Sequence, residues 1–84
     1  MKYAIRIERD AVKTLKKIAG PDRLRIVKAI DSLAEDPAGG ESLTGQFKGL
    51  RRLRVGDYRV IYACKNHECL VLVIRIGHRR EVYR

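Results

Sequence analysis

The sequence predicts an α+β fold in which two helices cover one face of a mostly antiparallel sheet. Apolar and polar residues alternate near the N-terminus, two segments with helical periodicity follow, and three strand-like segments separated by turns come last. The order strand, helix, helix, strand, strand, strand is typical of helices gathered on one face of an antiparallel sheet. A chain of 84 residues is expected to form one domain over residues 1–84.

The first strand is predicted at the N-terminus. Tyr3, Ile5 and Ile7 alternate with charged or small residues, which is the pattern of a half-buried strand. Asp10 is expected to be the N-cap of the first helix, because its carboxylate can accept hydrogen bonds from the free N–H groups of the first turn. The strand is therefore expected to lead directly into a helix that begins at Ala11.

Two helices are predicted between Ala11 and Pro37. Gly20-Pro21 ends the first and starts the second, because proline is tolerated in the first turn of a helix but not in its interior. The residues expected to face the sheet are Ala11, Leu15 and Ile18 in the first helix and Leu24, Val27, Ile30, Leu33 and Ala34 in the second. So short a turn makes the two helices an antiparallel hairpin. Residues 36–46, DPAGGESLTGQ, are predicted to be a loop.

The rest of the chain predicts a three-stranded antiparallel meander. Its parts are, in order, a strand at residues 48–55, the turn Gly56-Asp57, a strand at 58–64, a turn at 65–68 and a strand at 69–76. The simplest assignment of the last strand turns Leu70, Leu72, Ile74 and Ile76 toward the helices. It leaves Ile61, Ala63, Val71 and Val73 as an apolar strip on the opposite, open face.

The composition predicts a cytoplasmic protein that does not enter a membrane. The longest aliphatic run, Leu70 to Ile74, is far too short to span a bilayer, and the start MKYAIRIERD lacks the apolar core of a signal peptide. Cys64 and Cys69 flank the last turn, where they could face each other closely enough for a disulfide. In a reducing compartment they are expected to remain two thiols.

Positive charge is concentrated in the second half of the chain. The net charge is +9, yet residues 1–47 hold nine basic and seven acidic residues, whereas residues 48–84 hold ten basic and only three acidic ones. Such an imbalance creates a potential that attracts polyanions. Nucleic acid, an acidic protein partner, or both in turn are the candidate ligands.

Several arginines are expected to meet on the open face of the sheet. Because Leu53 and Val55 point toward the helices, Arg52 and Arg54 point away from them. The residues expected on this face are Arg52, Arg54, Arg59 and Arg75, with Arg79 just beyond the last strand. They could form a solvated edge, but guanidinium groups that converge from three strands favour an oxyanion site, and phosphate suits them best.

Few residues of the basic half can transfer a proton. Arginine keeps its proton at ordinary pH, so it can stabilise a phosphorane but cannot act as a general base. The candidates are His78, Tyr83 and Lys48: an imidazole titrates near neutral pH, and surrounding cations favour the ionised form of a phenol. His78 could instead be a surface turn residue, and Tyr83 could anchor the C-terminus by packing its ring.

The succession RRLRVGDYRVIY, a hairpin, and LVLVIRIGHRREVY resembles the second half of RelE-type toxins of the RelE/ParE superfamily. The strand and helix hairpin that precede it fit the same RelE-like fold. The segment GDYRVIY is characteristic of the superfamily, and the tail G-H-R-x-x-x-Y is more specific to its RNA-cleaving branch. The resemblance implies the toxin of a type II toxin–antitoxin system. Such a toxin would be a ribosome-dependent endoribonuclease that cuts A-site mRNA by attack of the ribose 2′-hydroxyl, inhibiting translation without a metal or other cofactor.

The same resemblance implies roles for individual residues. The catalytic residues are expected to be Arg52, Arg59, His78, Arg79 and Tyr83. The RNA-binding residues are expected to be Lys48, Arg51, Arg54, Arg75 and Arg80. Relatives often carry lysine at one of the positions of Arg52 and Arg54, so here the role of base falls to Tyr83, His78 or Lys48.

The implied partners are a cognate antitoxin with an acidic C-terminal segment, the ribosome and mRNA, with operator DNA reached only through the antitoxin complex. The antitoxin is expected to cover the apolar strip on the open face, as a helix in a groove or as an added strand. The alternative function is that of a ParE-like toxin, which inhibits gyrase and has no nuclease activity. A third is an inactive member that keeps only antitoxin and operator binding.

Overall fold

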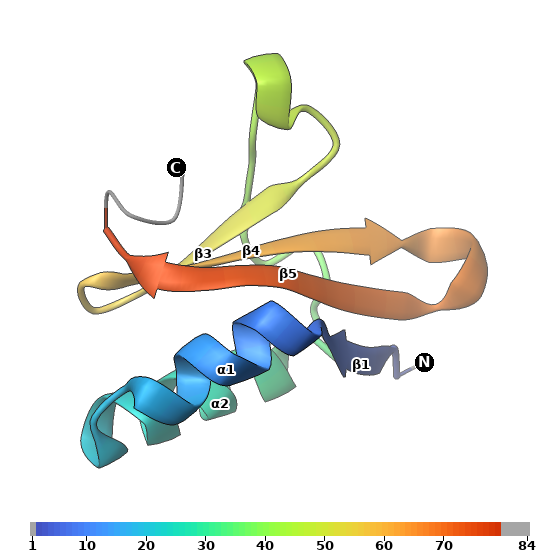
Figure 1. Cartoon of the computed structure of the whole chain (residues 1–84). Helices are drawn as coiled ribbons and strands as arrows, with labels where there is room; N and C mark the ends of the chain where they lie inside the picture. The colour runs from blue at the N-terminus through green and yellow to red at the C-terminus, as the bar shows by residue number, and fades with distance from the viewer. Residues whose placement is uncertain (1, 80–84) are drawn as a thin grey trace.

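The computed structural model describes residues 2–79 and has the predicted α+β architecture, with both helices beneath one face of the sheet (Figure 1). Its elements are β1 (Ala4–Ile7), α1 (Arg9–Lys17), α2 (Gly20–Ser32), β2 (Glu41–Ser42), the 3-10 turn η1 (Gly45–Phe47), β3 (Arg51–Val55), β4 (Tyr58–Lys65), the 3-10 turn η2 (Asn66–Glu68) and β5 (Leu70–His78). Neither helix of the described residues is long and apolar enough to cross a bilayer.

The five strands form one sheet in the order β1-β5-β4-β3-β2. β1 runs parallel to β5, and the other neighbours are antiparallel, so the predicted meander β3-β4-β5 is confirmed. The predicted loop 36–46 is partly wrong, because Glu41 and Ser42 form a short edge strand beside β3. β3 itself starts at Arg51 rather than at residue 48, since residues 47–50 form a turn in which Leu50 N–H donates to the carbonyl of Phe47.

The core lies between the helices and the sheet. On α1 the predicted residues Ala11, Leu15 and Ile18 are all buried. On α2 the prediction for Leu24 is wrong, because this side chain is 57% exposed, and the missed residue Ile26 is fully buried. The inner stripe of α2 runs through Ile26, Ile30 and Leu33, and burial of each such side chain contributes about 1.5–3 kcal/mol.

The prediction that Asp10 caps the first helix is also wrong. α1 begins at Arg9, its N-cap residue is Glu8, and no side chain forms a capping hydrogen bond there. The backbone N–H of Glu8 donates to the carbonyl of Val73 at 2.9 Å, so pairing with β5 holds the chain extended up to Glu8 and the helix starts immediately afterwards. Asp10 lies in the first turn, where its negative charge interacts favourably with the positive end of the helix dipole.

A β-bulge in β5 changes which residues face the core. Ile61 pairs with Arg75, but the next residue of β4, Tyr62, pairs with Val73, which leaves Ile74 as an extra residue in β5. A bulge of this kind shifts the alternation of side chains by one position. Arg75 therefore shares the open face with Ile61, as predicted from the sequence.

The bulge overturns half of the face assignment made for β5. Val71 and Val73, predicted on the open face, are fully buried in the core, and Leu70 and Leu72 lie on the opposite face. Ile76, beyond the bulge, faces the helices as predicted. The open face therefore carries Leu70 and Leu72 beside Ile61 and Ala63, in place of the two valines, and of these Ile61 is 3% and Leu70 9% exposed.

Cys64, near the end of β4, and Cys69, directly after η2, form no disulfide with each other. The Cys64 thiol donates to Asn66 Oδ1 at 3.3 Å, and the Tyr3 hydroxyl donates to the same oxygen at 2.8 Å. Burial raises the pKa of the Tyr3 phenol above its ordinary value, and negative charge on Cys64 and Cys69 raises it further. These contacts tie the start of β1 to the turn η2.

The chain between α2 and β2 is attached to the sheet by the buried Tyr62. Its hydroxyl donates to the carbonyl of Pro37 at 2.9 Å and accepts from the backbone N–H of Gly40 at 2.9 Å. A side chain at position 40 would not fit, because its Cβ would lie 2.6 Å from the carbonyl oxygen of Arg52 and 2.8 Å from the Tyr62 hydroxyl. Glycine at this position therefore allows the close approach that places Glu41 beside β3.

We expect Gly40→Ala to lower the free energy of unfolding by about 1–3 kcal/mol, the usual cost of forcing extra volume into a packed site. Urea unfolding followed by circular dichroism measures this change. Gly20→Ala is the matched control, since a Cβ at Gly20 meets nothing within 4 Å and alanine is favoured in a helix. Equal stabilities of the two variants would contradict the close approach at Gly40.

Candidate functional site

Four arginines from three strands meet on the open face of the sheet. These residues, Arg52 and Arg54 of β3, Arg59 of β4 and Arg75 of β5, are called the arginine cluster below. Arg54 is the direct partner of Arg59, and Arg52 and Arg75 both pair with Ile61 between them. Neighbouring strands lie about 4.8 Å apart and the two rows are about 7 Å apart along the strands, so all four side chains start within a small area.

The arginine cluster is unfavourable for the isolated sheet. Like charges directly opposite one another on neighbouring strands destabilise their pairing, and Arg54 and Arg59 are such a pair. An anion bound between them removes this repulsion. The planar guanidinium group forms paired hydrogen bonds with phosphate or carboxylate oxygens, so the cluster is chemically suited to either ligand.

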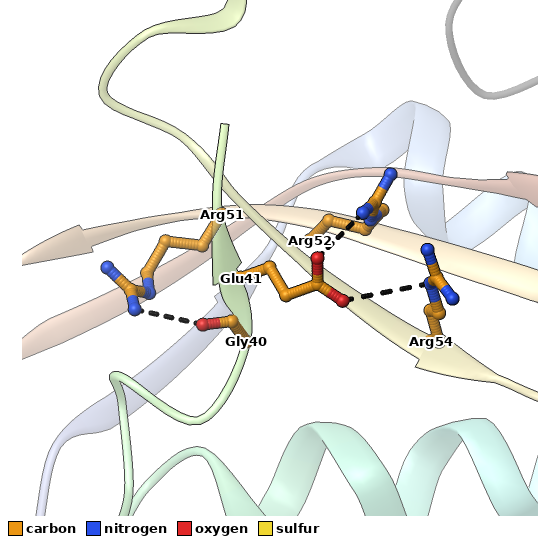
Figure 2. Close-up of polar contacts among 5 residues, drawn as sticks. All are labelled: Gly40, Glu41, Arg51, Arg52 and Arg54. Atoms are coloured by element: carbon orange, nitrogen blue, oxygen red, sulfur yellow. Dashed lines mark hydrogen bonds and ion pairs between the residues drawn. The ribbon is translucent and has the colours of Figure 1, made fainter. Parts of the chain in front are cut away.

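Glu41 brings a carboxylate into the arginine cluster from β2 (Figure 2). Its Oε2 accepts from the Arg52 guanidinium at 2.9 Å, and its Oε1 lies 3.8 Å from Arg54 Nε. The sequence reasoning missed this residue because it placed residues 36–46 in a loop. The signal that could have found it is the pair of glycines at 39 and 40, since consecutive glycines often mark a close approach of two backbone segments.

Arg51 lies on the other face of the sheet, although it is next to Arg52 in sequence. Its guanidinium donates to the carbonyl oxygens of Gly40 and Ala38 at 2.9 and 3.1 Å and to the Ser42 hydroxyl at 3.0 Å (Figure 2 draws the bond to Gly40). The sequence predicted an RNA-binding role for Arg51. The structure instead uses its donors to hold the segment before β2, so Arg51 is not part of the arginine cluster.

His78 is also separated from the arginine cluster. It pairs with Tyr58, whose neighbour Arg59 pairs with Gly77, so alternation turns Tyr58 and His78 toward the helices. The two rings form an edge-to-face contact with centroids 5.4 Å apart. Both line a cavity of about 620 Å³ between α1 and β5, and the structure therefore does not bring His78 together with Arg59.

The remaining predicted site residues lie in turns or outside the described residues. Arg79 is exposed, and its backbone N–H donates to the carbonyl of Asp57 at 2.8 Å, which holds it beside the β3–β4 turn. This is the end of the sheet at which Arg54 and Arg59 lie. Lys48 is exposed in the turn that follows η1. Tyr83 and Arg80, predicted as catalytic and RNA-binding residues, lie outside the described residues.

A further arginine on the open face comes from β1. Arg6 pairs with Leu72 of β5 and is exposed, so it extends the positive charge of this face to a fourth strand. The alternation of residues 3–7 already indicated that Arg6 points away from the core. Its position relative to the arginine cluster depends on the parallel pairing of β1 with β5, which no local pattern reveals.

The open face has groups for charge stabilisation and for proton transfer. Its arginines can stabilise a dianionic transition state but cannot accept a proton. The carboxylate of Glu41 can accept one, so it joins Lys48 and Tyr83 as a candidate base. Within residues 2–79, no group of three or more histidine, cysteine or acidic side chains is arranged to hold a metal ion.

Comparison with known proteins identifies the family. Residues 5–83 match the family described as the ParE toxin of type II toxin–antitoxin system, parDE. The chain belongs to this toxin family. Toxin RelG of Mycobacterium tuberculosis is 28% identical over 86 residues, which cover 100% of this chain and 99% of RelG. The protein is thus a RelE-type toxin of the RelE/ParE superfamily, as the motifs in its sequence predicted.

Solved structures of RelE-type toxins share the fold of this toxin. The M. tuberculosis RelBE2 toxin–antitoxin complex contains a chain that matches with a TM-score of 0.87 at 25% identity, covering 94% of this toxin and 93% of that chain. A mutant of E. coli toxin RelE in the free state matches with a TM-score of 0.81 at 24% identity, covering 99% and 92%. The α+β, RelE-like fold predicted from the sequence is confirmed.

Arg51 and Arg54 lie on opposite faces of β3, and they should behave differently when each is replaced by alanine. Arg51→Ala should lower the free energy of unfolding by about 1–3 kcal/mol, because it removes the donors that hold the segment before β2. Arg54→Ala should leave stability nearly unchanged. It should instead reduce by about 0.7 the slope of log affinity against log salt for a short single-stranded RNA.

Urea unfolding and fluorescence anisotropy at several salt concentrations measure these two effects. A stable Arg51→Ala variant with a reduced salt slope would show that Arg51 contacts phosphate, against the assignment made here.

Proposed function

We propose that this toxin is an endoribonuclease that cleaves mRNA in the ribosomal A site and so inhibits translation. The observation that carries the proposal is the arginine cluster, in which side chains of three strands converge on one face despite their mutual repulsion. A phosphate group of RNA is the ligand that best suits such a cluster. The relation to RelE-type toxins supports the same function.

The proposed reaction is attack of the ribose 2′-hydroxyl on the adjacent phosphate, which forms a 2′,3′-cyclic phosphate and breaks the bond from phosphorus to the 5′-oxygen of the next nucleotide. The 2′-hydroxyl gives up its proton to a base, and the leaving 5′-oxygen takes up a proton. Negative charge builds up on the phosphate oxygens in the transition state, and Arg59 and Arg52 are placed to stabilise it. Loss of one such donor typically costs about 10²–10³ in rate. The base that takes the 2′-hydroxyl proton is then Tyr83, Lys48 or Glu41, because His78 faces the helices.

The composition of the open face supports the proposed dependence on the ribosome. Its described part offers strong charge stabilisation, yet no acid–base pair of side chains in mutual contact. An enzyme of this kind gains most from a substrate already held in a reactive geometry, and such positioning can contribute about 7–11 kcal/mol to lowering the barrier. We propose that the ribosome supplies that geometry by holding the mRNA.

We further propose that a cognate antitoxin with an acidic segment binds the basic half of this toxin, and that operator DNA is reached only through that complex. Solved complexes of RelE-type toxins with their antitoxins, from M. tuberculosis and Pyrococcus horikoshii, support a partner of this class. The apolar residues of the open face are Ile61, Ala63, Leu70 and Leu72, and Ile61 and Leu70 are already nearly buried, so the proposed attraction rests mainly on charge.

The description of the matching family as ParE toxins favours a second candidate function, inhibition of gyrase without nuclease activity. Toxins with either function have the same fold, but only an endoribonuclease cuts RNA. Purified ribosomes programmed with mRNA separate them, since only a nuclease yields mRNA cut at the A site. Inhibition of DNA supercoiling by gyrase, with intact mRNA, would support the second candidate.

Arg59→Ala should reduce ribosome-dependent cleavage by about 10²–10³, because it removes a donor to the charged transition state. Its melting temperature should stay close to that of the wild type, since its side chain donates to the carbonyl of the preceding Tyr58, a local contact that contributes little to the core. Single-turnover cleavage and a thermal melt measure both quantities. Lys16→Ala, on the exposed side of α1, is a matched loss of one charge and should leave cleavage unchanged.

Cleavage at the wild-type rate by Arg59→Ala would remove this residue from the chemistry. An Arg59→Ala chain that fails to fold would instead make the arginine a structural residue.

Tyr83→Phe and His78→Gln test the two predicted proton-transfer residues. If the Tyr83 phenol takes part in the reaction, its loss should lower single-turnover cleavage by at least about 10². His78→Gln should cleave nearly as fast as the wild type, because the imidazole lies against Tyr58 on the helix side of the sheet. A loss of comparable size in the histidine variant would mean that His78 reaches the RNA, contrary to its position in this structure.

A further inference from the structure

We propose that Glu41 is an internal competitor for the phosphate site, so that an RNA phosphate reaches Arg52 and Arg54 only by displacing its carboxylate. The inference deepens the proposed function, on which it rests, by naming a residue that sets how tightly the site takes its substrate.

The contacts of Glu41 are those that a phosphate would make. One carboxylate oxygen lies 2.9 Å from the Arg52 guanidinium and the other lies 3.8 Å from that of Arg54, so the group spans both arginines (Figure 2). A phosphate also offers two or more oxygens to guanidinium groups. Two anions cannot occupy the same donors at close range, because their charges repel one another.

Arg52 is the arginine most affected by this competition. Its side chain is only 20% exposed, whereas those of Arg54 and Glu41 are 58% and 62% exposed. The Glu41 carboxylate lies 2.9 Å from the Arg52 guanidinium, so a phosphate that is to bind the same nitrogen must take the position that the carboxylate holds. Within residues 2–79 the Glu41 carboxylate forms ion pairs with Arg52 and Arg54 and not with Arg59, so RNA can reach Arg59 while the carboxylate remains in place.

A phosphate can displace the Glu41 carboxylate because this side chain is weakly held. It is largely exposed, and Glu41 belongs to a strand of two residues at the edge of the sheet. An exposed carboxylate–arginine pair typically changes an equilibrium by no more than about fivefold. The Glu41 carboxylate thus weakens the binding of RNA that is free in solution, but it does not block the site. An mRNA held by the ribosome can still displace it.

Glu41→Gln tests the proposal, because glutamine keeps the size of the side chain and removes its charge. Glu35→Gln is the matched control: it raises the net charge equally, and Glu35 forms its ion pair with Lys2, at 3.8 Å, rather than with an arginine of the cluster. The probe is a short single-stranded RNA with 2′-O-methyl groups throughout, which cannot be cleaved. We expect Glu41→Gln to bind it about two- to fivefold more tightly than Glu35→Gln in anisotropy titrations at equal salt.

Affinity of Glu41→Gln equal to or weaker than that of Glu35→Gln would overturn the proposal. Glu41→Asp gives an independent test should the first variant not fold, since it keeps the net charge but is one methylene too short to span both arginines. It should also bind more tightly than the wild type, and unchanged affinity would count against the competitor. Because the probe cannot be cut, these results do not depend on nuclease activity, which Arg59→Ala tests separately.

Discussion

The pairing of β4 with both of its neighbours is the constraint on which the rest of this structure depends. β4 is the middle strand of the sheet, and its register decides which residues of β3 and β5 share a face with its own. On one side this register buries Val60 and Tyr62 against the helices. On the other it brings the arginine cluster together. A slip of one residue would exchange the two faces, so the same hydrogen bonds maintain both the core and the charged site.

Tyr62 connects this register to the edge of the sheet. The ring is fully buried, while the hydroxyl holds Pro37 and Gly40 through one accepted and one donated hydrogen bond. Arg51 adds further bonds to the same segment from the same face. Two arginines adjacent in the sequence therefore serve different purposes: Arg51 builds the edge that carries Glu41, and Arg52 receives the carboxylate of Glu41 on the opposite face.

The sequence was sufficient to predict features that depend on local periodicity. The α+β order, the helix hairpin, the meander and the common face of Arg52, Arg54 and Arg59 follow from alternation and helical spacing. The position of β2 was not predictable in this way, since two residues carry no pattern and Glu41 reaches its place through long-range contacts. The side of the sheet on which His78 lies could have been predicted. Ile76 was assigned to the helices, and a residue two positions further along a strand shares its face, but the strand was expected to end at Ile76.

The bulge at Ile74 has a consequence for how related chains are compared. If the side chains of β5 alternated regularly through Ile74, Arg75 would share the buried face of Val73, and the arginine cluster would lose one of its four members. Whether the strand bulges at Ile74 thus matters as much as which residues flank it. Two chains aligned without a gap in this strand can carry the same letters and yet present opposite side chains to a ligand, depending on whether each contains the bulge.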